Sequence, residues 1–469
     1  MPTKTQHTDA ASLWEGMART GLADRFLHAP SQSLPLTALA GASAIAGGAD
    51  RLRGRAVLVA TSEQLTAALA FIDLDGAAAR MIVCPPGFPD AHLPEICKKA
   101  GIDAIVTDRD ASCFDAISAC EIVSLSANLC TGIAPRVAGH ATEWVLFTSG
   151  TTGLPKLAAH SLAALTGAIK RAALQDPHVW ATFYDIRRYG GLQIFLRAML
   201  GNASLVLSSP DDPVADHLVR LGRHSVTHIS GTPSHWRRVL MSPAVPSFAP
   251  RTVRLSGEIA DQAVLDGLRA RFPAANIGHA YASTEAGVGF EVADGLEGFP
   301  AAYVESGLGE VEMKVEDGSL LIRSKRTAGR YIGEERTLIR EDGFVNTGDT
   351  VELRGDRYYF TGRRDGVINV GGQKVHPEEV ETVINRHPSV SASLVKTQRN
   401  PIMGAIVVAD VVLNPPEPQS LSTERRAALQ REILDACRAQ LANHKVPALI
   451  RFLPALDLTS GGKLARTNA

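Results

Sequence analysis

Short apolar runs alternate with longer segments of helical composition in the first third of the chain. The apolar runs cover residues 56–60, 81–84 and 103–107, and the segments between them cover residues 62–73 and 89–100. Runs of four or five apolar residues are typical of buried strands, whereas the intervening segments are long enough for helices. The alternation predicts a βαβαβ unit, in which helices cover a parallel sheet. A break containing Pro and Gly at residues 131–139 closes this unit.

The apolar pattern changes twice in the next two hundred residues. A second series of strands and helices runs from Trp144 to about Phe290, with strand candidates at residues 204–209, 226–230 and 252–256. At residues 307–359 the two runs 310–315 and 319–324 flank an Asp-Gly pair. This arrangement predicts antiparallel β structure with a hairpin turn.

The last hundred residues predict a separate unit. Pro377 opens a short helix with acidic residues in its first turn, and strand candidates follow at residues 391–397 and 404–413. A longer helix begins at about Ser422 and carries an apolar stripe at four-residue spacing, Leu429, Ile433, Cys437 and Leu441. We therefore predict a large α/β domain at residues 1–362, with parallel sheets, helices and a small β unit. A smaller α+β domain is predicted at residues 363–469.

Composition narrows the class of protein. The 469 residues carry 48 basic and 49 acidic side chains, so no global field attracts nucleic acid or an anionic membrane. No window approaches the roughly 20 apolar residues that span a bilayer, and the N-terminus lacks a signal-peptide pattern, which predicts a cytosolic protein. Six cysteines contain no C-x-x-C pair, which argues against a disulfide framework or a structural zinc site.

The strongest chemical signal is the segment Phe147–Lys156, FTSGTTGLPK, which directly follows a strand candidate at residues 143–146. Its glycines let backbone N–H groups approach an anion, its hydroxyls add donors, and Lys156 adds a cation. These groups suit a phosphate, although the spacing differs from that of a Walker A loop.

This segment resembles the phosphate loop of the adenylate-forming superfamily, which includes acyl-CoA synthetases, luciferases and the adenylation domains of nonribosomal peptide assembly. The resemblance implies a catalytic role for Lys156 and a role for Thr152 near the metal. It also assigns six residues to ATP binding: Thr148, Ser149, Gly150, Thr151, Thr152 and Gly153.

A second segment, His279–Glu285, is similar to the aromatic-Gly-x-Thr-Glu motif of that superfamily, with Ala282 in place of the usual glycine. The resemblance implies that Tyr281 lies near the adenine, followed by Ala282 and Ser283. It gives Thr284 a contact with the α-phosphate and Glu285 a bound Mg²⁺, since a hard cation commonly lies between a carboxylate and a triphosphate. The alternative for Thr284 and Glu285 is the capping of a helix N-terminus.

Three further segments also match, one upstream of this segment and two downstream, in the order in which they occur in the family. Gly257 and Glu258 match a loop that packs on the adenine, and Asp349 matches an aspartate that binds the ribose hydroxyls. The run 361–381 resembles the interdomain segment almost throughout. It implies that Arg363 contacts the ribose and that Asp365 is the hinge of a mobile C-terminal domain. In the same run, Gly371, Gly372 and Lys374 are assigned to the thiol-dependent step.

Residues 459–466 resemble the terminal T-x-x-G-K-x-x-R motif, which makes Lys463 the catalytic lysine. The implied enzyme is an acid–CoA ligase that uses ATP and Mg²⁺, forms an acyl-adenylate, and transfers the acyl group to coenzyme A. A stand-alone enzyme that loads the phosphopantetheine of a carrier protein shares all these motifs. A degraded nucleotide-binding protein is disfavoured, because Lys156, Glu285, Asp349 and Lys463 are all retained.

The acyl pocket is predicted, more weakly, at Tyr184, Asp185, Gly190 and Gly191. Asp185 would pair with the ammonium of an amino-acid substrate if it faced the pocket, and the alternative is an ion pair with Arg187 or Arg188. Three histidines at residues 224, 228 and 235 lack the carboxylates or cysteines that would favour a metal site. The oligomeric state cannot be read from the sequence, and a homodimer is compatible with it.

Overall fold

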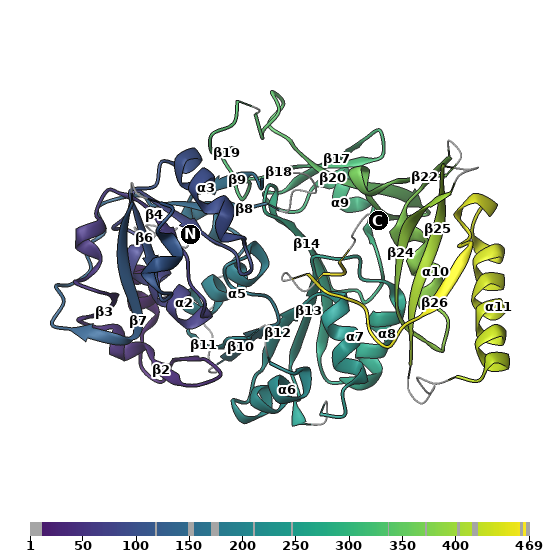
Figure 1. Ribbon diagram of the computed structural model, residues 1–469, viewed down its shortest axis with the longest axis horizontal. Helices are drawn as coiled ribbons and strands as arrows, with labels where there is room; N and C mark the ends of the chain where they lie inside the picture. Colours follow the sequence, from purple (N-terminus) through teal and green to yellow (C-terminus); the bar gives the residue numbers. More distant parts are fainter. Residues whose placement is uncertain are drawn as a thin grey trace, which may run out of the picture.

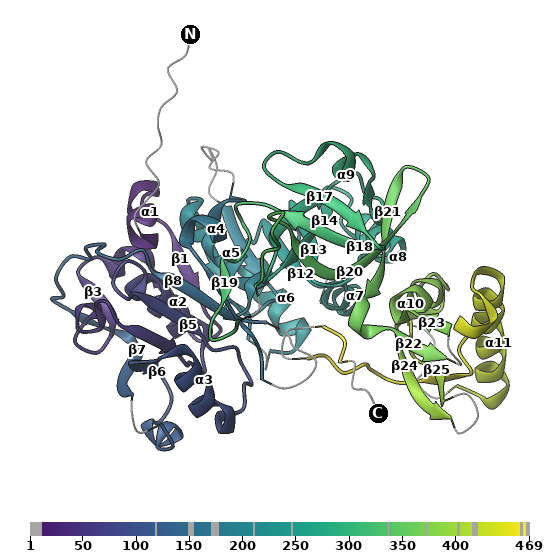
Figure 2. The same cartoon turned by 90° about the horizontal axis from the view of Figure 1, so that it is seen from above.

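The computed structural model describes residues 12–117, 120–148, 154–169, 178–209, 212–244, 247–335, 337–370, 373–400, 404–414, 421–459 and 463–465. Figure 1 shows the N-terminal part of the chain on one side, a central part beside it, and the C-terminal part on the other side. Figure 2 shows the C-terminal part set apart from the rest. The fold is a large α/β domain followed by a smaller domain, as predicted.

The first sheet contains the predicted βαβαβ unit. Its strands, in spatial order, are β19 (Arg330–Tyr331), β9 (Leu157–His160), β8 (Glu143–Phe147), β5 (Arg80–Val83), β4 (Ala56–Val59), β6 (Ala104–Thr107), β7 (Glu121–Thr131) and β3 (Ala42–Ile45). The central strands β8, β5, β4, β6 and β7 run parallel, and antiparallel strands close both edges. This sheet extends past the break at residues 131–139, because β8 pairs in parallel with β5. The predicted start of the second unit at Trp144 is therefore wrong.

The second sheet has the same size and a similar plan. Its strands, in spatial order, are β15 (Gly287–Val292), β14 (Asn276–Ser283), β13 (Thr252–Ser256), β12 (His228–Gly231), β10 (His178–Thr182), β11 (Ala203–Val206), β1 (Phe26–His28) and β2 (Ser33–Pro35). Six strands from β14 to β1 are parallel. The predicted strands at 204–209, 226–230 and 252–256 are confirmed as β11, β12 and β13. No local pattern predicted that β1, from the start of the chain, joins this sheet.

The third sheet is the predicted antiparallel unit. Its strands, in spatial order, are β16 (Phe299–Pro300), β21 (Arg357–Arg363), β20 (Val345–Arg354), β18 (Ser319–Arg323) and β17 (Glu312–Glu316). The predicted hairpin joins β17 to β18 through Asp317 and Gly318, whose φ angles are 48° and 71°. Positive φ at both central residues is typical of the tight turn that suits twisted strands.

The C-terminal part has its own core. Its strands are β22 (Ile368–Val370), β23 (Gln373–Val375), β24 (Val390–Asn400), β25 (Gly404–Leu413) and β26 (Leu449–Phe452). Helices α10 (Pro377–Asn385) and α11 (Thr423–Gln440) pack on them. The helix α11 begins where it was predicted to begin, and the Ser422 side chain caps it. Val375, Val380, Ile433 and Cys437 are fully buried in one apolar cluster drawn from these elements.

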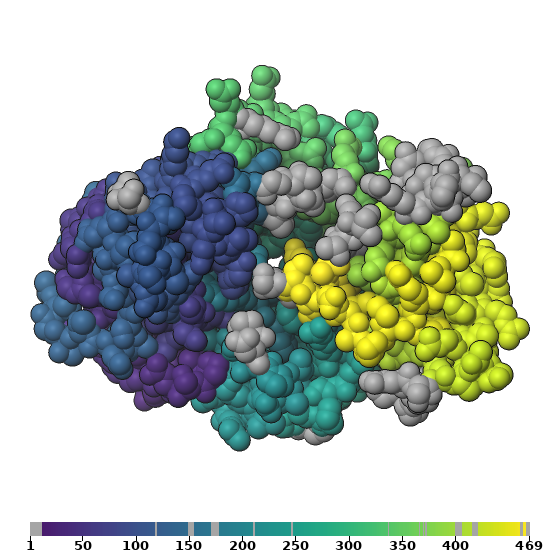
Figure 3. Space-filling view, in the orientation of Figure 1, coloured from purple at the N-terminus to yellow at the C-terminus, as the bar shows by residue number. Residues whose placement is uncertain are grey.

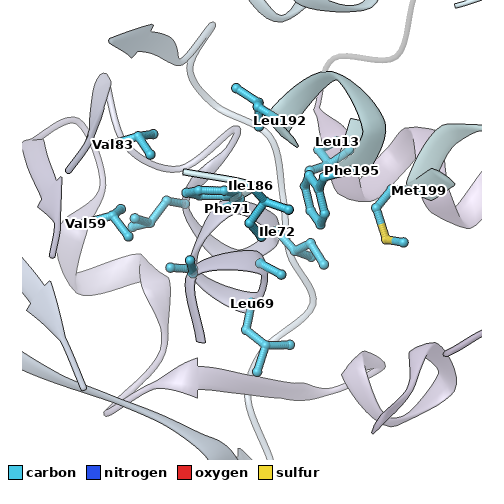
Figure 4. Packing of buried hydrophobic residues seen from close by; sticks show 14 of the residues in the cluster. Leu13, Val59, Leu69, Phe71, Ile72, Val83, Ile186, Leu192, Phe195 and Met199 are labelled. Atoms are coloured by element: carbon cyan, nitrogen blue, oxygen red, sulfur yellow. The ribbon is translucent and has the colours of Figure 1, made fainter. Parts of the chain in front are cut away.

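The other helices belong to the large domain. They are α1 (Leu13–Thr20), α2 (Gln64–Leu74), α3 (Leu93–Ala100), α4 (Leu162–Thr166), α5 (Tyr189–Leu200), α6 (Val214–Arg223), α7 (Pro233–Met241), α8 (Gln262–Arg271) and α9 (Ala302–Ser306). Every residue of α2 is buried. Figure 4 shows Phe71 of α2 beside Phe195 of α5, with ring centroids 5.7 Å apart. Because α5 also packs on the second sheet, this contact joins the two halves of the large domain.

The end of the chain returns to the large domain. After β26 it leaves the C-terminal part and runs back toward α7, as Figures 1 and 2 show. The Arg238 guanidinium of α7 donates to the Leu456 carbonyl at 3.1 Å, and Leu464 packs in a small apolar cluster with Met241. Figure 3 shows this segment at the surface, against the part of the molecule that contains α7. It therefore links the two domains in addition to the β21–β22 connection.

Candidate active site

Lys156 lies where the predicted phosphate loop rejoins the first sheet. The loop spans the antiparallel strands β8 and β9, and the Thr148 amide donates to the Lys156 carbonyl at 2.9 Å. The ammonium lies 5.0 Å from the ring centroid of Tyr331, a cation–π contact that restrains the side chain. Residues Ser149, Gly150, Thr151, Thr152 and Gly153 lie outside the described part of the chain. Paired strands therefore flank the loop on both sides.

The segment His279–Glu285 forms strand β14 and the turn into β15. Ser283 pairs with Gly287, and the Ser283 hydroxyl accepts a hydrogen bond from the Ala286 amide at 3.0 Å. Thr284 and Glu285 are the first two turn residues. The alternative that they cap a helix is therefore wrong, because the chain continues into an antiparallel strand. Ala282 is half-buried in β14 and packs against the main apolar cluster.

Asp349 joins two of the predicted nucleotide residues. The Tyr281 hydroxyl donates to Oδ2 of Asp349 at 2.5 Å, and the Arg363 guanidinium lies 3.6 Å from Oδ1. Burial and the Asp349 charge raise the pKa of Tyr281 well above its usual value, so the hydroxyl keeps its proton and donates. The Tyr281 ring packs nearly parallel to Phe290 and Phe360. The aromatic ring and the carboxylate are thus fixed relative to each other.

Glu285 fits the requirement for Mg²⁺. Glu285 is half-buried, and among the described residues no side chain or amide donates a hydrogen bond to its carboxylate. Mg²⁺ in nucleotide enzymes is commonly held by one or two carboxylates together with substrate phosphates and water. The described residues contain no cluster of three or more potential metal ligands, including around His224, His228 and His235. A single available carboxylate is therefore compatible with a magnesium ion that arrives with the triphosphate.

Lys463 lies against the loop after β13. Gly257 has a φ of +87°, and a β-carbon at this position would lie 3.4 Å from Cε of Lys463. The next residue, Glu258, accepts hydrogen bonds from the amides of Ser234 and Leu464, each at 2.9 Å. The Lys463 backbone is also paired with Thr459. The structure thus brings Lys463 to Gly257 and Glu258, which lie about 200 residues earlier in the chain.

Four charged groups act electrostatically on the Lys463 ammonium. The surrounding protein lowers the pKa of Lys463, chiefly by desolvation, and the positive charges of Arg363 and Arg188 act in the same direction. Glu258 and Asp349 oppose this shift. The residue as a whole keeps an exposed surface, so water screens these effects. Lys463 lies within electrostatic reach of the Asp349 and Arg363 pair, which places the two predicted parts of the site together.

The predicted acyl-pocket residues cluster at the start of α5. Tyr184 is buried and its hydroxyl donates to the Ser256 carbonyl at 2.7 Å. Asp185 forms two hydrogen bonds with the buried Arg187 guanidinium, at 2.8 and 2.6 Å, as the alternative interpretation predicted. Gly190 packs on the Tyr184 ring, and a β-carbon at Gly191 would lie 2.2 Å from the Asp185 carbonyl oxygen. Gly191 thus allows close packing of α5.

The predicted hinge and thiol-step residues lie between β21 and β23. Asp365 is the middle residue of the short 3-10 helix Arg364–Gly366, and its side chain lies outside the description. Gly371 and Gly372 also lie outside the described residues. Lys374 is an exposed residue of β23. The structure therefore locates the linker, and the roles of these residues stay predictions.

Comparison with known proteins identifies the family. The model of the AMP-binding enzymes matches residues 41–331, which is more than half of the chain. The chain belongs to the AMP-binding enzyme family. The model of the C-terminal domain of AMP-binding enzymes matches residues 379–463. The two matched ranges lie on either side of the linker that contains Asp365.

Several known proteins are similar to this chain along most of its length. The 2-succinylbenzoate–CoA ligase of Salmonella typhimurium is 26% identical over 353 residues, which cover 73% of each protein. A mitochondrial acyl-coenzyme A synthetase of Rattus norvegicus is 27% identical over 350 residues, covering 69% of this chain and 60% of the relative. The crystal structure of an anthranilate CoA ligase in complex with anthranoyl-AMP superposes with a TM-score of 0.79 at 18% identity, covering 97% and 95% of the two chains. At 18% identity, the similarity to this crystal structure shows the fold alone.

Two contacts of this AMP-binding enzyme were not predicted from its sequence. Tyr331 under Lys156 comes from the distant strand β19, and the bond between Glu258 and Leu464 joins the two domains. Neither residue pair has a local sequence signal, because both contacts depend on how separate elements pack.

In the part of the chain that the structure describes, no helix is long and apolar enough to span a bilayer.

Proposed function

We propose that this AMP-binding enzyme is an ATP-dependent carboxylic acid–CoA ligase that acts through an acyl-adenylate. The observation that carries the proposal is the position of Lys463. It lies against Gly257 and within electrostatic reach of Asp349 and Arg363. A cation beside two predicted nucleotide-binding groups suits the first half-reaction, in which negative charge develops on phosphoryl oxygens.

In the first step the substrate carboxylate attacks the α-phosphorus of ATP, and the bond to pyrophosphate breaks. The resulting acyl-AMP keeps the α-phosphate. Lys463 stabilises the developing charge, Asp349 and Arg363 hold the ribose, and Tyr281 lies beside the adenine. Lys156 and the amides of the loop that follows Thr148 bind phosphate oxygens. The reaction needs no protein nucleophile, so positioning and electrostatics supply the catalysis.

We assign Glu285 to Mg²⁺, together with Thr152 of the phosphate loop. When bound, the ion neutralises charge on the ATP phosphates. Thr284 precedes this carboxylate in the same turn, and we assign it to the α-phosphate.

In the second step a thiol attacks the acyl carbon and AMP leaves. We propose that the C-terminal domain turns about Asp365 to withdraw Lys463 and to present Gly371, Gly372 and Lys374. The linker of residues 364–366 lies between the ranges matched by the two family models, which supports a boundary near residue 363. Such a hinge lets one site serve two half-reactions.

Coenzyme A is the acceptor we favour, because the similar proteins reported above carry names of CoA ligases. A carrier protein with phosphopantetheine offers the same thiol and is the alternative. An α-amino acid is the less favoured acid. The Asp185 carboxylate that would pair with its ammonium is already paired with Arg187, and both side chains are buried.

The deciding assay measures pyrophosphate release from Mg·ATP over a panel of acids, with and without coenzyme A. The panel includes 2-succinylbenzoate, anthranilate, aliphatic acids and amino acids. Release that depends on one acid class and is accelerated by coenzyme A supports the proposal. Release that is accelerated only by a carrier protein with a free phosphopantetheine thiol supports the alternative. A lack of release with every acid of a widened panel contradicts both.

A further inference from the structure

Glu258 connects the two domains through its side chain. One carboxylate oxygen accepts the Ser234 amide and the other accepts the Leu464 amide, each at 2.9 Å. Ser234 is in the first turn of α7 in the large domain, whereas Leu464 directly follows Lys463 in the C-terminal segment. A single side chain therefore joins the framework of the large domain to the neighbour of the proposed catalytic lysine.

The large-domain side of this connection is firmly built. Thr232 caps α7 by accepting from the His235 amide at 3.1 Å, and the His235 ring accepts from the Thr232 amide at 3.1 Å. Burial lowers the pKa of His235 to about 3, so the ring stays neutral and can accept. The N-terminal end of a helix favours a negative charge, which suits the Glu258 carboxylate. Glu258 is thus held in place before the C-terminal segment reaches it.

We propose that Glu258 is the positioning residue that places Lys463 for adenylation, and that its bond to Leu464 breaks before the thiol-dependent step. The proposal rests on the adenylation role proposed for Lys463 above. In this proposal Glu258 stabilises the domain arrangement that is used for adenylation, in addition to any packing of its loop on the adenine.

The other contacts between the domains hold different parts. Arg386, which directly follows α10, forms an ion pair with Glu297 at 2.8 Å, and Asn385 donates to Asp261 at 3.3 Å. Both anchor the body of the C-terminal domain. The Arg238 bond to the Leu456 carbonyl reaches the C-terminal segment eight residues before Leu464. Glu258 alone among these groups binds the residue adjacent to Lys463, so its loss should act on the lysine more than on domain docking.

The charges around the lysine agree with this role. Arg363 and Arg188 repel the Lys463 ammonium, and Glu258 and Asp349 attract it. Of these four groups, Asp349 alone then opposes the two arginines once the Glu258 charge is removed. The ammonium is then less well held, and its proton is lost at lower pH.

The test compares Glu258→Gln with the wild-type protein in the two half-reactions. Gln keeps the length of the side chain, but its amide group is a donor, so it can accept only one of the two amides. Losing a hydrogen bond to a charged acceptor predicts a fall of about 10- to 100-fold in acyl-adenylate formation. Thioester formation from supplied acyl-adenylate should fall far less than acyl-adenylate formation does, because Lys463 is withdrawn in that step, whereas packing of the loop on the adenine is common to both steps.

Arg386→Gln is the matched control, since it removes a contact between the same domains away from Lys463. Its ion pair is partly exposed, so both half-reactions should change by less than about threefold. The double variant Glu258→Gln, Lys463→Ala should form acyl-adenylate no more slowly than Lys463→Ala alone. If Glu258→Gln lowers both half-reactions equally, or if its effect persists fully without Lys463, the positioning role is wrong.

Hydrogen exchange supplies a readout that does not depend on catalysis. In the Glu258→Gln variant the Leu464 amide should exchange at least roughly tenfold faster, while amides in α11 keep their wild-type rates. Unchanged protection of Leu464 would overturn the proposal. A wild-type protein that forms no acyl-adenylate but shows this exchange difference would instead contradict the proposed function and leave the contact established.

Discussion

Lys156 and Lys463 are both proposed to act on the phosphates, yet the molecule holds them in different ways. Lys156 directly precedes β9, which pairs with β8 and β19, and its ammonium packs over Tyr331. Lys463 lies in a segment outside any regular strand or helix, and Glu258 binds the amide of the next residue. One cation belongs to the sheet framework, and the other is carried by the C-terminal segment.

This difference indicates a division of labour. A cation fixed in the sheet can bind phosphate in every domain arrangement, whereas one on a separate segment can be present in one step and absent in the other. The segment that carries Lys463 has few contacts with the large domain, so the placement of Lys463 depends on a few hydrogen bonds. Variants that remove or immobilise the delivered lysine should therefore separate the two half-reactions.

The largest effect is expected for Lys463→Ala. Removing a charge that stabilises the transition state should lower acyl-adenylate formation by at least about 10²–10³-fold. Single-turnover assays with ATP and acid measure this step, and supplied acyl-adenylate measures the second step, which should persist. Lys463 is exposed, so thermal unfolding should match that of wild type. Wild-type adenylation in this variant would remove Lys463 from the mechanism.

A proline at the hinge should produce the opposite separation. Asp365→Pro fixes φ at one residue of the linker and restricts the residue before it. We expect acyl-adenylate formation within about threefold of wild type and thioester formation lowered by at least about tenfold, because the domain cannot turn. Rapid-quench measurement of both products checks this. Equal loss of both steps would show that Asp365 is not the hinge.

The pH profile should reveal the delivered lysine in the wild-type protein. The protein around Lys463 lowers its pKa, so its positive charge is lost as pH rises through a value below the ordinary one of about 10.4. The rate of acyl-adenylate formation should fall by about tenfold per pH unit above that value. Thioester formation from supplied acyl-adenylate should lack this fall. An adenylation rate that stays constant past pH 10.4 would contradict the lowered pKa.

The smallest effect is expected in the framework, at Tyr281→Phe. This change removes the bond to Asp349 while keeping the ring between its aromatic neighbours. Loss of one hydrogen bond predicts an increase of about 2- to 10-fold in the KM for ATP, with the rate of thioester formation from supplied acyl-adenylate unchanged. Steady-state kinetics at varied ATP measures it. A loss of more than a hundredfold would mean that the hydroxyl has a role beyond holding Asp349.

Most of the fold could be predicted because local patterns decided it. The runs that became β4, β5 and β6 are short and apolar, the Asp317-Gly318 pair set a hairpin, and Ser422 marked the start of α11. The pairing of β1 with β11 could not be predicted, since it joins residues about 180 apart. For the same reason the bond between Glu258 and Leu464 left no trace in either segment.

The site followed a similar rule. Motifs located Lys156, Tyr281, Asp349 and Lys463, and the structure describes all four with Tyr281 bonded to Asp349. The partner of Asp185 stayed undecided in the sequence, because Arg187 and Arg188 both lie within three residues of it. Side-chain direction at the start of α5 selects Arg187 and gives it to Asp185 in a buried pair. Adjacent candidates of one type can be separated only by packing.

The complete burial of α2 has a consequence for how the chain can be divided. One side of this helix meets the first sheet, and Phe71 meets α5, which is more than a hundred residues later. A fragment that stops before α5 would expose an apolar helix that has no polar face for water, and such a surface promotes aggregation. The two eight-stranded halves should therefore be unsuitable as separately expressed fragments, even though each has a sheet of its own.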